Sequence, residues 1–388
     1  MNTQITRREM LAGSAAVATT FFIGRSASAA PKAKIKSIDV ISRQPHLYNG
    51  WPTLARRKDG QLLVVCSGGR ESHVCPFGRV ELMRSDDGGK TWSWPRILLD
   101  GAIDDRDAGV LETAKGSILV TTFTSLAFES TLRSAEQAKP GTGWPAEKLS
   151  RWIAARDRIP AEQRKEELGV WMIRSTDGGV TWSVRYDCKV NSPHGPIPLS
   201  DGRVLYAGKE LWHGDNRIGV CESADDGQSW RWLATIPTRP GDDHKDYHEL
   251  HAIEAADGSV VIHIRNHNKS NSRETLQSES TDGGKTWSVP HAIGVWGLPS
   301  HLLQLKDGRL LMSYGHRRRP FGNQARISDD HGRTWSEPMI ISGDGPGGDL
   351  GYPSTVQLDD GSLVTVWYEL MKGTSKAVLR QARWSLGG

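Results

Sequence analysis

The chain has 388 residues and a formal net charge of +4, and 37% of its residues are hydrophobic. Three arginines and one glutamate in the first thirty residues supply +2 of that charge, so the remainder lacks the strong positive field that nucleic-acid binding needs. The 42 glycines and 15 tryptophans, with few leucine-rich helical stretches, favour an all-β fold of many short strands and tight turns.

The first thirty residues have the order of a twin-arginine export signal. Arg7 and Arg8 precede a weakly apolar run over residues 10–24, and small residues follow up to Ala29. The run is too short and too rich in alanine and glycine for a stable membrane span. We therefore expect residues 1–30 to engage the twin-arginine (Tat) export machinery, and a periplasmic or secreted mature domain over residues 31–388.

Cysteine and histidine spacing gives little sign of a metal centre. The four cysteines are too few and too dispersed for a disulfide scaffold, although Cys66 and Cys75 could pair after export. The chain has no Cys-x-x-Cys motif, and the His-x-x-x-His pair His244 and His248 lies in a polar stretch that does not resemble a helix. We therefore expect neither a metal nor another cofactor.

An eight-residue string of the form Ser-x-Asp-x-Gly-x-Thr/Ser-Trp occurs five times. Its aspartate can accept hydrogen bonds from backbone N–H groups in a turn, its glycine can take a positive φ, and its tryptophan brings a large apolar face to the next strand. A catalytic role would require five active sites, so we interpret these aspartates as turn residues. They are Asp87, Asp177, Asp225, Asp282 and Asp330.

The spacing of the repeats predicts a propeller. Successive strings are 90, 48, 57 and 48 residues apart, and a unit of about fifty residues is the period of a propeller blade. A second repeat, in which a Gly-containing turn leads into an apolar strand, occurs six times. We infer a six-bladed β-propeller, with a strand at residues 34–42 closing the ring. The six repeats begin at Pro52, Ala108, His194, Leu250, Ser300 and Pro353.

The longest step between strings contains an insertion. Residues 125–168 include a charged, helix-prone stretch that is broken at Pro160. We expect a helical insertion in blade two that lies over one face in the manner of a lid.

Tryptophan-bearing aspartate boxes on a six-bladed propeller resemble the sialidase (neuraminidase) superfamily, and the resemblance covers nearly the whole mature chain. It implies an active site at the ends of the inner strands. There the family has three arginines for the substrate carboxylate, a tyrosine nucleophile activated by a glutamate, and an aspartate acid/base.

Three positions match this pattern directly. HELHAIEAADGSVVIHIRNH resembles the fourth-blade pattern, which implies Glu249 as the base and Arg265 as a carboxylate-binding arginine. GYPSTVQLDDGSLVTVWYE resembles the final-blade pattern, which implies Tyr352 as the nucleophile. A further arginine falls in the cluster GHRRRP, where Arg319 matches best and Arg317 is the other candidate. A phenol with a pKa of ~10 needs a neighbouring base at neutral pH, and guanidinium groups bind carboxylates at two points.

Two positions depart from the family pattern. Gly50, in YNGWP, stands where the family has its first carboxylate-binding arginine; Arg106 has the same register one blade on, with a salt bridge to a neighbouring aspartate as its alternative role. His73 lies near the position of the acid/base aspartate, and imidazole can transfer that proton near neutrality. The remaining substrate-binding candidates at inner-strand ends are Trp51, Arg70, Asp107, His194 and His301.

These features predict a sialidase-like, exo-acting glycoside hydrolase that releases a terminal acidic sugar, sialic acid or a similar one, from a glycan. Two alternatives stay open. Several histidines with a tyrosine and arginines also suit β-elimination by a polysaccharide lyase acting on uronic-acid glycans. The missing arginine and aspartate instead suit a non-catalytic glycan-binding propeller.

Overall fold

The structure is a computed structural model that describes residues 31–139, 141–212, 214–270 and 274–387. The expected export signal at residues 1–30 lies outside the described residues and stays a prediction. None of the helices within these four ranges is long and apolar enough to span a membrane.

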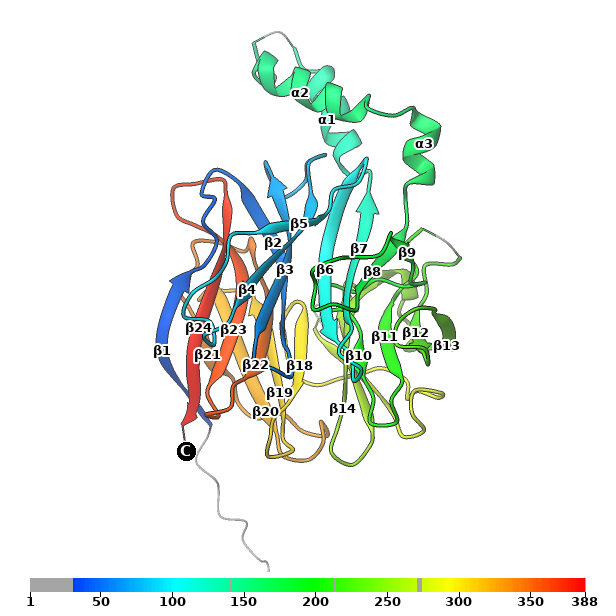
Figure 1. Ribbon diagram of the computed structural model, residues 1–388, viewed down its shortest axis with the longest axis vertical. Coiled ribbons are helices and arrows are strands. Elements are labelled where there is room, and N and C mark those ends of the chain that lie inside the picture. The colour runs from blue at the N-terminus through cyan, green and yellow to red at the C-terminus, as the bar shows by residue number, and fades with distance from the viewer. Residues whose placement is uncertain (1–30, 140, 213, 271–273, 388) are drawn as a thin grey trace, which may run out of the picture. The chain divides into compact units, whose positions relative to one another are not determined.

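Six four-stranded antiparallel sheets make up most of the described chain, and each sheet is one blade of a β-propeller (Figure 1). The six blades expected from the repeats are therefore confirmed. Blade one contains β2 (Tyr48–Arg56), β3 (Leu62–Arg70), β4 (Arg79–Ser85) and β5 (Arg96–Leu99). Blade two contains β6 (Asp104–Glu112), β7 (Ile118–Ser125), β8 (Val170–Ser175) and β9 (Tyr186–Asp187). Blade three contains β10 (Ile197–Pro198), β11 (Val204–Lys209), β12 (Ile218–Ser223) and β13 (Arg231–Thr235).

The second half of the ring repeats this order. Blade four contains β14 (Tyr247–Glu254), β15 (Val260–Asn266), β16 (Leu276–Ser280) and β17 (His291–Ala292). Blade five contains β18 (Ser300–Gln304), β19 (Leu310–His316), β20 (Gly322–Ser328) and β21 (Met339–Ser342). Blade six contains β22 (Leu350–Gln357), β23 (Leu363–Leu370), β24 (Ala377–Gly387) and the N-terminal strand β1 (Lys32–Val40). The pairing of β1 with β24 confirms that an N-terminal strand completes a blade and closes the ring.

The first strand of each blade belongs to an inner ring. β2 contacts the first strands of both neighbouring blades, β6 and β22, and β18 contacts β14 and β22 in the same way. The Leu54 N–H bonds the Ser354 hydroxyl oxygen, and Arg56, further along β2, bonds Asp359 beyond the C-terminal end of β22, so these two strands run in the same direction. Residues near their N-terminal ends are thereby gathered at one end of the ring.

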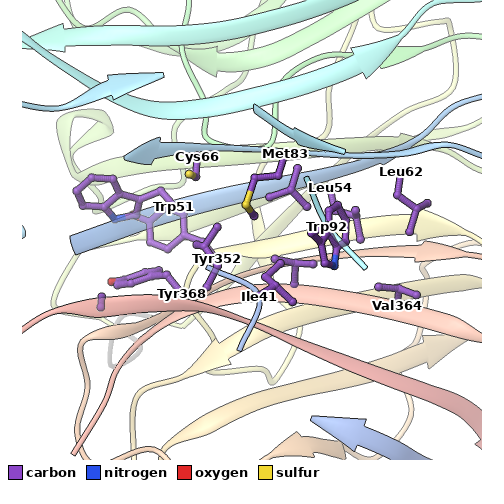
Figure 2. Close-up of a cluster of buried hydrophobic side chains, with 14 of the residues drawn as sticks. Ile41, Trp51, Leu54, Leu62, Cys66, Met83, Trp92, Tyr352, Val364 and Tyr368 are labelled. Carbon is purple, nitrogen blue, oxygen red and sulfur yellow. The ribbon is translucent and has the colours of Figure 1, made fainter. Parts of the chain in front are cut away.

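Apolar side chains fill the space between neighbouring blades. Figure 2 shows one such cluster, in which Leu54, Leu62 and Val364 lie toward one side and Trp51 and Tyr352 toward the other. The apolar core therefore reaches directly to the residues expected at the active site.

The aspartates of the five repeated strings, the aspartate boxes, hold turns through hydrogen bonds, as predicted. In the fourth box Asp282 Oδ1 accepts hydrogen bonds from the backbone N–H groups of Lys285 (3.0 Å) and Thr286 (2.9 Å), and Oδ2 accepts one from the Thr286 hydroxyl (2.6 Å). These bonds lower the pKa of Asp282 to about 2. Trp287 of the same box is 9% exposed and packs in the core between blades.

Three helices occupy the connection between β7 and β8: α1 (Phe128–Glu136), α2 (Ala146–Arg156) and α3 (Ala161–Glu166). Pro160 immediately precedes α3, because its ring suits the start of a helix but not the interior. Figure 1 shows α1 and α2 beyond the ends of β6 and β7. Their apolar residues Phe128, Leu132 and Trp152 pack around Cys75, in the segment that follows β3.

The pairing of Cys66 with Cys75 that the sequence allows does not occur in this structure. All four cysteines are free and buried. Cys66 lies in the core between blades one and six, whereas Cys75 lies under α1 and α2. The two thiols therefore belong to different hydrophobic clusters.

Candidate active site

Four inner strands carry a β-bulge near the N-terminal end, and each bulge contains a non-glycine residue with positive φ. Such backbone is uncommon for residues with a side chain, and a bulge changes the direction in which the residue points. The four positions belong to β2, β6, β14 and β22. They are Trp51 (φ 52°), Asp107 (φ 44°), Glu249 (φ 36°) and Tyr352 (φ 54°).

Tyr352, Glu249 and Arg265 form one hydrogen-bonded group. The Tyr352 hydroxyl donates to Glu249 Oε1, and Arg265 Nη1 donates to Glu249 Oε2. Arg265 Nη1 also lies 3.1 Å from the Tyr352 hydroxyl oxygen. Glu249 and Arg265 come from the paired strands β14 and β15, and Tyr352 comes from β22, so the structure joins two neighbouring residues with one that follows them by 103 and 87 positions.

The protonation states of this group suit a phenol paired with a base. Burial raises the pKa of Tyr352 well above its usual range, and the charge of Glu249 adds to that effect. Burial acts to raise the pKa of Glu249 as well, but the positive charge of Arg265 and the hydrogen bonds from Tyr352 and Arg265 outweigh it and lower the pKa. Glu249 is therefore ionised at neutral pH and accepts a hydrogen bond from a neutral Tyr352.

Arg317 rather than Arg319 lies at this group, which corrects the preference for Arg319. Arg317 Nε donates to the Leu350 carbonyl oxygen (2.9 Å), and the guanidinium carbon lies 5.8 Å from the centre of the Tyr352 ring. Arg319 is exposed, and its guanidinium lies over Phe321 instead. The three arginines follow β19 in an irregular segment, so their register could not be counted from the sequence.

The other predicted arginines, Arg70 and Arg106, are both bound to Asp104. Arg70 is fully buried and makes two hydrogen bonds to the carboxylate of Asp104 (2.6 and 3.0 Å). The Arg106 side chain is 12% exposed and lies 3.6 Å from Asp104, which matches the alternative role as a salt-bridge partner. Both guanidinium groups lie over the ring of Trp51, which is 1% exposed. Arg70 and Trp51 therefore support the site from below and do not present a surface to a substrate.

Asp107 is an acidic residue in an unusual environment. It is 7% exposed, and its carboxylate has no hydrogen-bond partner among the described residues. Burial raises the pKa of Asp107 to about 7, the charge of Glu249 acts in the same direction, and Arg106 opposes the shift. Asp107 therefore changes charge near neutral pH.

His73 belongs to a polar cluster that the sequence analysis did not find. Its Nδ1 lies 3.1 Å from Asp349 Oδ1 and 2.9 Å from the Tyr48 hydroxyl. The Tyr368 hydroxyl also bonds Asp349 Oδ1 (3.0 Å). Burial acts to raise the pKa of Asp349, but the hydrogen bonds and charge of these partners outweigh it and lower the pKa. Asp349 precedes Tyr352 by three residues, and this spacing was the available signal.

His194 and His301 form a buried cluster with His251. Their ring centres are 4.5 to 5.3 Å apart, and the three residues are between 2% and 7% exposed. They line a cavity of about 340 Å³ that continues along the inner strands toward Arg56 and Gln357. Burial lowers the pKa of all three, in His301 to about 3. The three histidines thus line a cavity that does not include Tyr352, Glu249 or Arg265 in its wall.

No cluster of three or more metal-ligating side chains occurs in the described parts of the chain. His251 Nδ1 accepts a hydrogen bond from the Leu302 N–H (2.9 Å), so the proton of the neutral ring is on Nε2. This arrangement does not suit metal binding at Nε2.

Comparison with known proteins places the chain in a family. The BNR repeat-like domain family matches residues 155–365, and the BNR/Asp-box repeat matches residues 83–93. A sialidase of Bacteroides fragilis (strain YCH46) is 25% identical over 349 residues, which cover 82% of this chain; the chain spans 59% of the length of that curated relative.

Two solved structures show the same fold. A protein of unknown function from Dyadobacter fermentans has a TM-score of 0.72 and 22% identity over 92% of this chain and 99% of that one. The NanB sialidase from Streptococcus pneumoniae has a TM-score of 0.64 and 14% identity over 91% of this chain and 70% of that one. With its box repeats, its six blades and the matching family, the chain belongs to the BNR repeat-like domain family and to the sialidase superfamily.

Proposed function

We propose that this chain is an exo-acting glycoside hydrolase that removes a terminal acidic sugar, sialic acid or a similar one, from a glycan. The observation that carries the proposal is the contact of Tyr352 with an ionised Glu249 that Arg265 also binds. A buried tyrosine that donates to a carboxylate can act as a nucleophile without a separate charge of its own, which suits an anionic substrate.

The reaction proceeds in two steps in this proposal. Tyr352 Oη attacks the anomeric carbon while its proton passes to Glu249, and the bond to the leaving oxygen breaks as that oxygen takes a proton from the acid/base candidate His73. Water then attacks the same carbon and gives a proton to His73, the bond to Tyr352 breaks, and Glu249 returns the proton to the phenolate. Each displacement inverts the anomeric centre, so the sugar is released with its original configuration.

Recognition of the acidic group falls to Arg265 and Arg317. Arg317 uses Nε and Nη2 for contacts with Leu350 and Tyr368, and its Nη1 has no acceptor among the described residues. That nitrogen is available to a substrate carboxylate. Gly50 supplies no charge, and a side chain there would meet the ring of Tyr48 at 3.3 Å. The site therefore relies on two arginines where the resemblance implies three.

Hydrolysis is favoured over the lyase reaction by the placement of the histidines. The lyase alternative drew on several histidines near the inner-strand ends. His194, His251 and His301 are almost fully buried, and burial lowers their pKa values, so they offer no exposed base to a polymer.

We also propose that the protein is exported and that the helical insertion braces the segment that carries His73. The twin-arginine pattern at residues 1–30 supports export of the folded protein and action on glycans in the periplasm or outside the cell. The packing of α1 and α2 around the segment that carries His73 supports a bracing role for the insertion, in place of the lid expected from its length.

Products and a covalent adduct test the proposal. The protein should release a reducing sugar from sialosides without the ultraviolet absorbance of an unsaturated lyase product. A fluorinated acidic glycosyl donor should label the peptide that contains GYPSTVQ, as seen by mass spectrometry. A label on another peptide, or absorbance without a reducing sugar, would rule out the proposed mechanism.

A further inference from the structure

We propose that Asp349 is a positioning residue that holds His73 with its Nδ1 protonated, so that His73 Nε2 carries the proton to and from the leaving oxygen. The reaction step rests on the proposed function, whereas the arrangement of the imidazole does not. The proposal adds a residue to the site that the family pattern of an aspartate acid/base does not contain.

Asp349 contacts the acid/base candidate His73 and lies three residues before Tyr352 in the sequence. Asp349 directly precedes β22, the strand of Tyr352, and its Oδ1 lies 3.1 Å from His73 Nδ1. Tyr48 donates to the same carboxylate at 3.0 and 3.1 Å, and Tyr368 donates at 3.0 Å. Three donors from three separate segments therefore converge on one carboxylate.

The hydrogen bonds fix which nitrogen of His73 is protonated. Each tyrosine hydroxyl has one proton, which it can give to Asp349; the Tyr48 oxygen, 2.9 Å from His73 Nδ1, can then accept from the same N–H. An ionised carboxylate has no proton to give, so the short contact with His73 requires that Nδ1 carries the hydrogen. In the neutral imidazole Nε2 is then the bare nitrogen that can accept a proton.

The remaining contacts leave Nε2 free. The ring of Trp51 meets the imidazole edge-on, with ring centres 5.0 Å apart. The His73 side chain is 45% exposed, and its Nε2 has no hydrogen-bond partner in the part of the chain that the structure describes. Two residues away, Glu71 accepts a hydrogen bond from Trp152 of α2 (2.8 Å), so the helical insertion holds the segment in place.

The proton balance of the two steps is complete with this pair. His73 enters the first step as the imidazolium, with a hydrogen on each nitrogen. When the glycosidic bond breaks, its electron pair goes to the leaving oxygen, which takes the proton from His73 Nε2 and leaves the neutral ring protonated at Nδ1. In the second step the attacking water gives a proton to Nε2 and its oxygen forms the new bond to the anomeric carbon. Asp349 stays ionised throughout and stabilises the charged imidazolium, as an orienting carboxylate does beside a catalytic histidine.

Nitrogen NMR tests the orientation directly. In protein with ¹⁵N-labelled histidine, His73→Gln identifies the His73 signals by their loss. We expect neutral His73 to show a protonated Nδ1, and Asp349→Asn to shift the population toward protonated Nε2. A native protein with protonated Nε2, or a tautomer that Asp349→Asn leaves unchanged, overturns the proposal.

Leaving-group dependence tests the reaction step. A nitrophenyl leaving group needs no acid, whereas a sugar leaving group does. Asp349→Asn should lower kcat/KM about 100-fold on a natural sialoside and less than about 5-fold on the nitrophenyl glycoside. His73→Gln should show the same pattern. Asp344→Asn is the matched control, because Asp344 lies in the same connecting segment but binds Arg380, and it should act like native protein.

The other outcomes are also decisive. Equal losses on both substrates would mean that Asp349 only maintains structure or affinity, and the proposal would fail. If Asp349→Asn does not fold, two other results test the proposal. They are the losses of His73→Gln on the two substrates and the tautomer of His73 in the native protein. If the native protein cleaves neither substrate, the proposed function and this reaction step fall, while the tautomer still decides whether Asp349 orients His73.

Discussion

At the bulged end of the inner strands Tyr352, Glu249 and Arg265 form a charged, hydrogen-bonded group, whereas further along the ring His194, His251 and His301 form a neutral, buried cluster. Bulged strands supply Glu249 and Tyr352, each redirected by a shift in register, and Arg265 comes from β15, which pairs with β14. His251 and His301 lie in the regular part of their strands, where side chains pack on one another. Three of the four bulges thus bring polar side chains, Asp107, Glu249 and Tyr352, to one end of the ring, whereas Trp51 at the fourth bulge and the histidines of the regular ladder pack inside it.

The largest expected effect lies at the charged end. Tyr352→Phe should lower kcat by at least about a thousandfold, roughly 4 kcal/mol in the barrier, and leave folding and substrate affinity nearly unchanged, because only one hydroxyl is lost. Glu249→Gln should have a comparable effect. Since the two act as a unit, the double variant should be little worse than the worse single one. Steady-state kinetics check this, and full activity in Tyr352→Phe would place the chemistry elsewhere.

Asp107 gives the charged end a dependence on pH. Its folded pKa of about 7 lies above the usual 3.8, so its contribution to stability is complete below pH 3.8 and is lost as the pH rises through 7. At pH 8 the free energy of unfolding of Asp107→Asn should therefore exceed that of native protein by about 2 to 4 kcal/mol, with little difference at pH 4. Urea unfolding at the two pH values measures this difference. A gain of equal size at both pH values would contradict a titrating Asp107.

The histidine cluster should respond to pH with the opposite sign. His301 has a folded pKa of about 3, below the usual 6.5, so its contribution is complete above pH 6.5 and is lost as the pH falls toward 3. The stability difference between native protein and His301→Gln should change by about 2 to 3 kcal/mol between pH 7 and pH 4.5, in favour of the variant at low pH. Urea unfolding at the two pH values measures this stability difference. If the difference is the same at both pH values, the histidine cluster is not neutral in the folded protein.

Substitutions among the arginines sharpen the assignment of the carboxylate site. Arg317→Ala should weaken binding of an acidic substrate about 10- to 100-fold, or roughly 1.4 to 2.7 kcal/mol, and affect the neutral amide analogue less. Arg319→Ala is the matched control from the same cluster and should bind both ligands as native protein does. Calorimetry with the non-reacting Tyr352→Phe protein separates binding from turnover. Equal losses for acid and amide would argue against a carboxylate contact.

The smallest effect is expected far from both ends. Asp282→Ala removes the hydrogen bonds that hold the turn of one aspartate box. It should lower the free energy of unfolding by about 1 kcal/mol for each bond that water does not replace. Activity per folded molecule should stay at the native level. A folded variant without activity would show that the boxes do more than hold turns.

The repeats made most of the fold predictable. Boxes and turns are local signals, because Asp, Gly and Trp act within a few residues of their own position, and their period gave the blade count. The termini of the strands were predictable to within a few residues, as β1 shows: it runs from Lys32 to Val40 against an expected 34–42.

The site was only partly predictable. Tyr352, Glu249 and Arg265 could be found from family patterns, and the structure brings them together. The bulges could not be found, because a register shift depends on the partner strand and leaves no fixed mark in the sequence. Asp349 was missed for a related reason: its importance comes from His73, almost three hundred residues away.

The pairing of β1 with β24 has a consequence for folding kinetics. It joins the two most distant segments of the described chain, as shown by the contact of Lys32 with Gly387. Closing so long a loop is entropically costly and comes late, so we expect a slow final phase in refolding. Until β1 docks, β24 presents an unpaired edge that other chains can extend. Aggregation during refolding should therefore depend on how fast this one strand arrives.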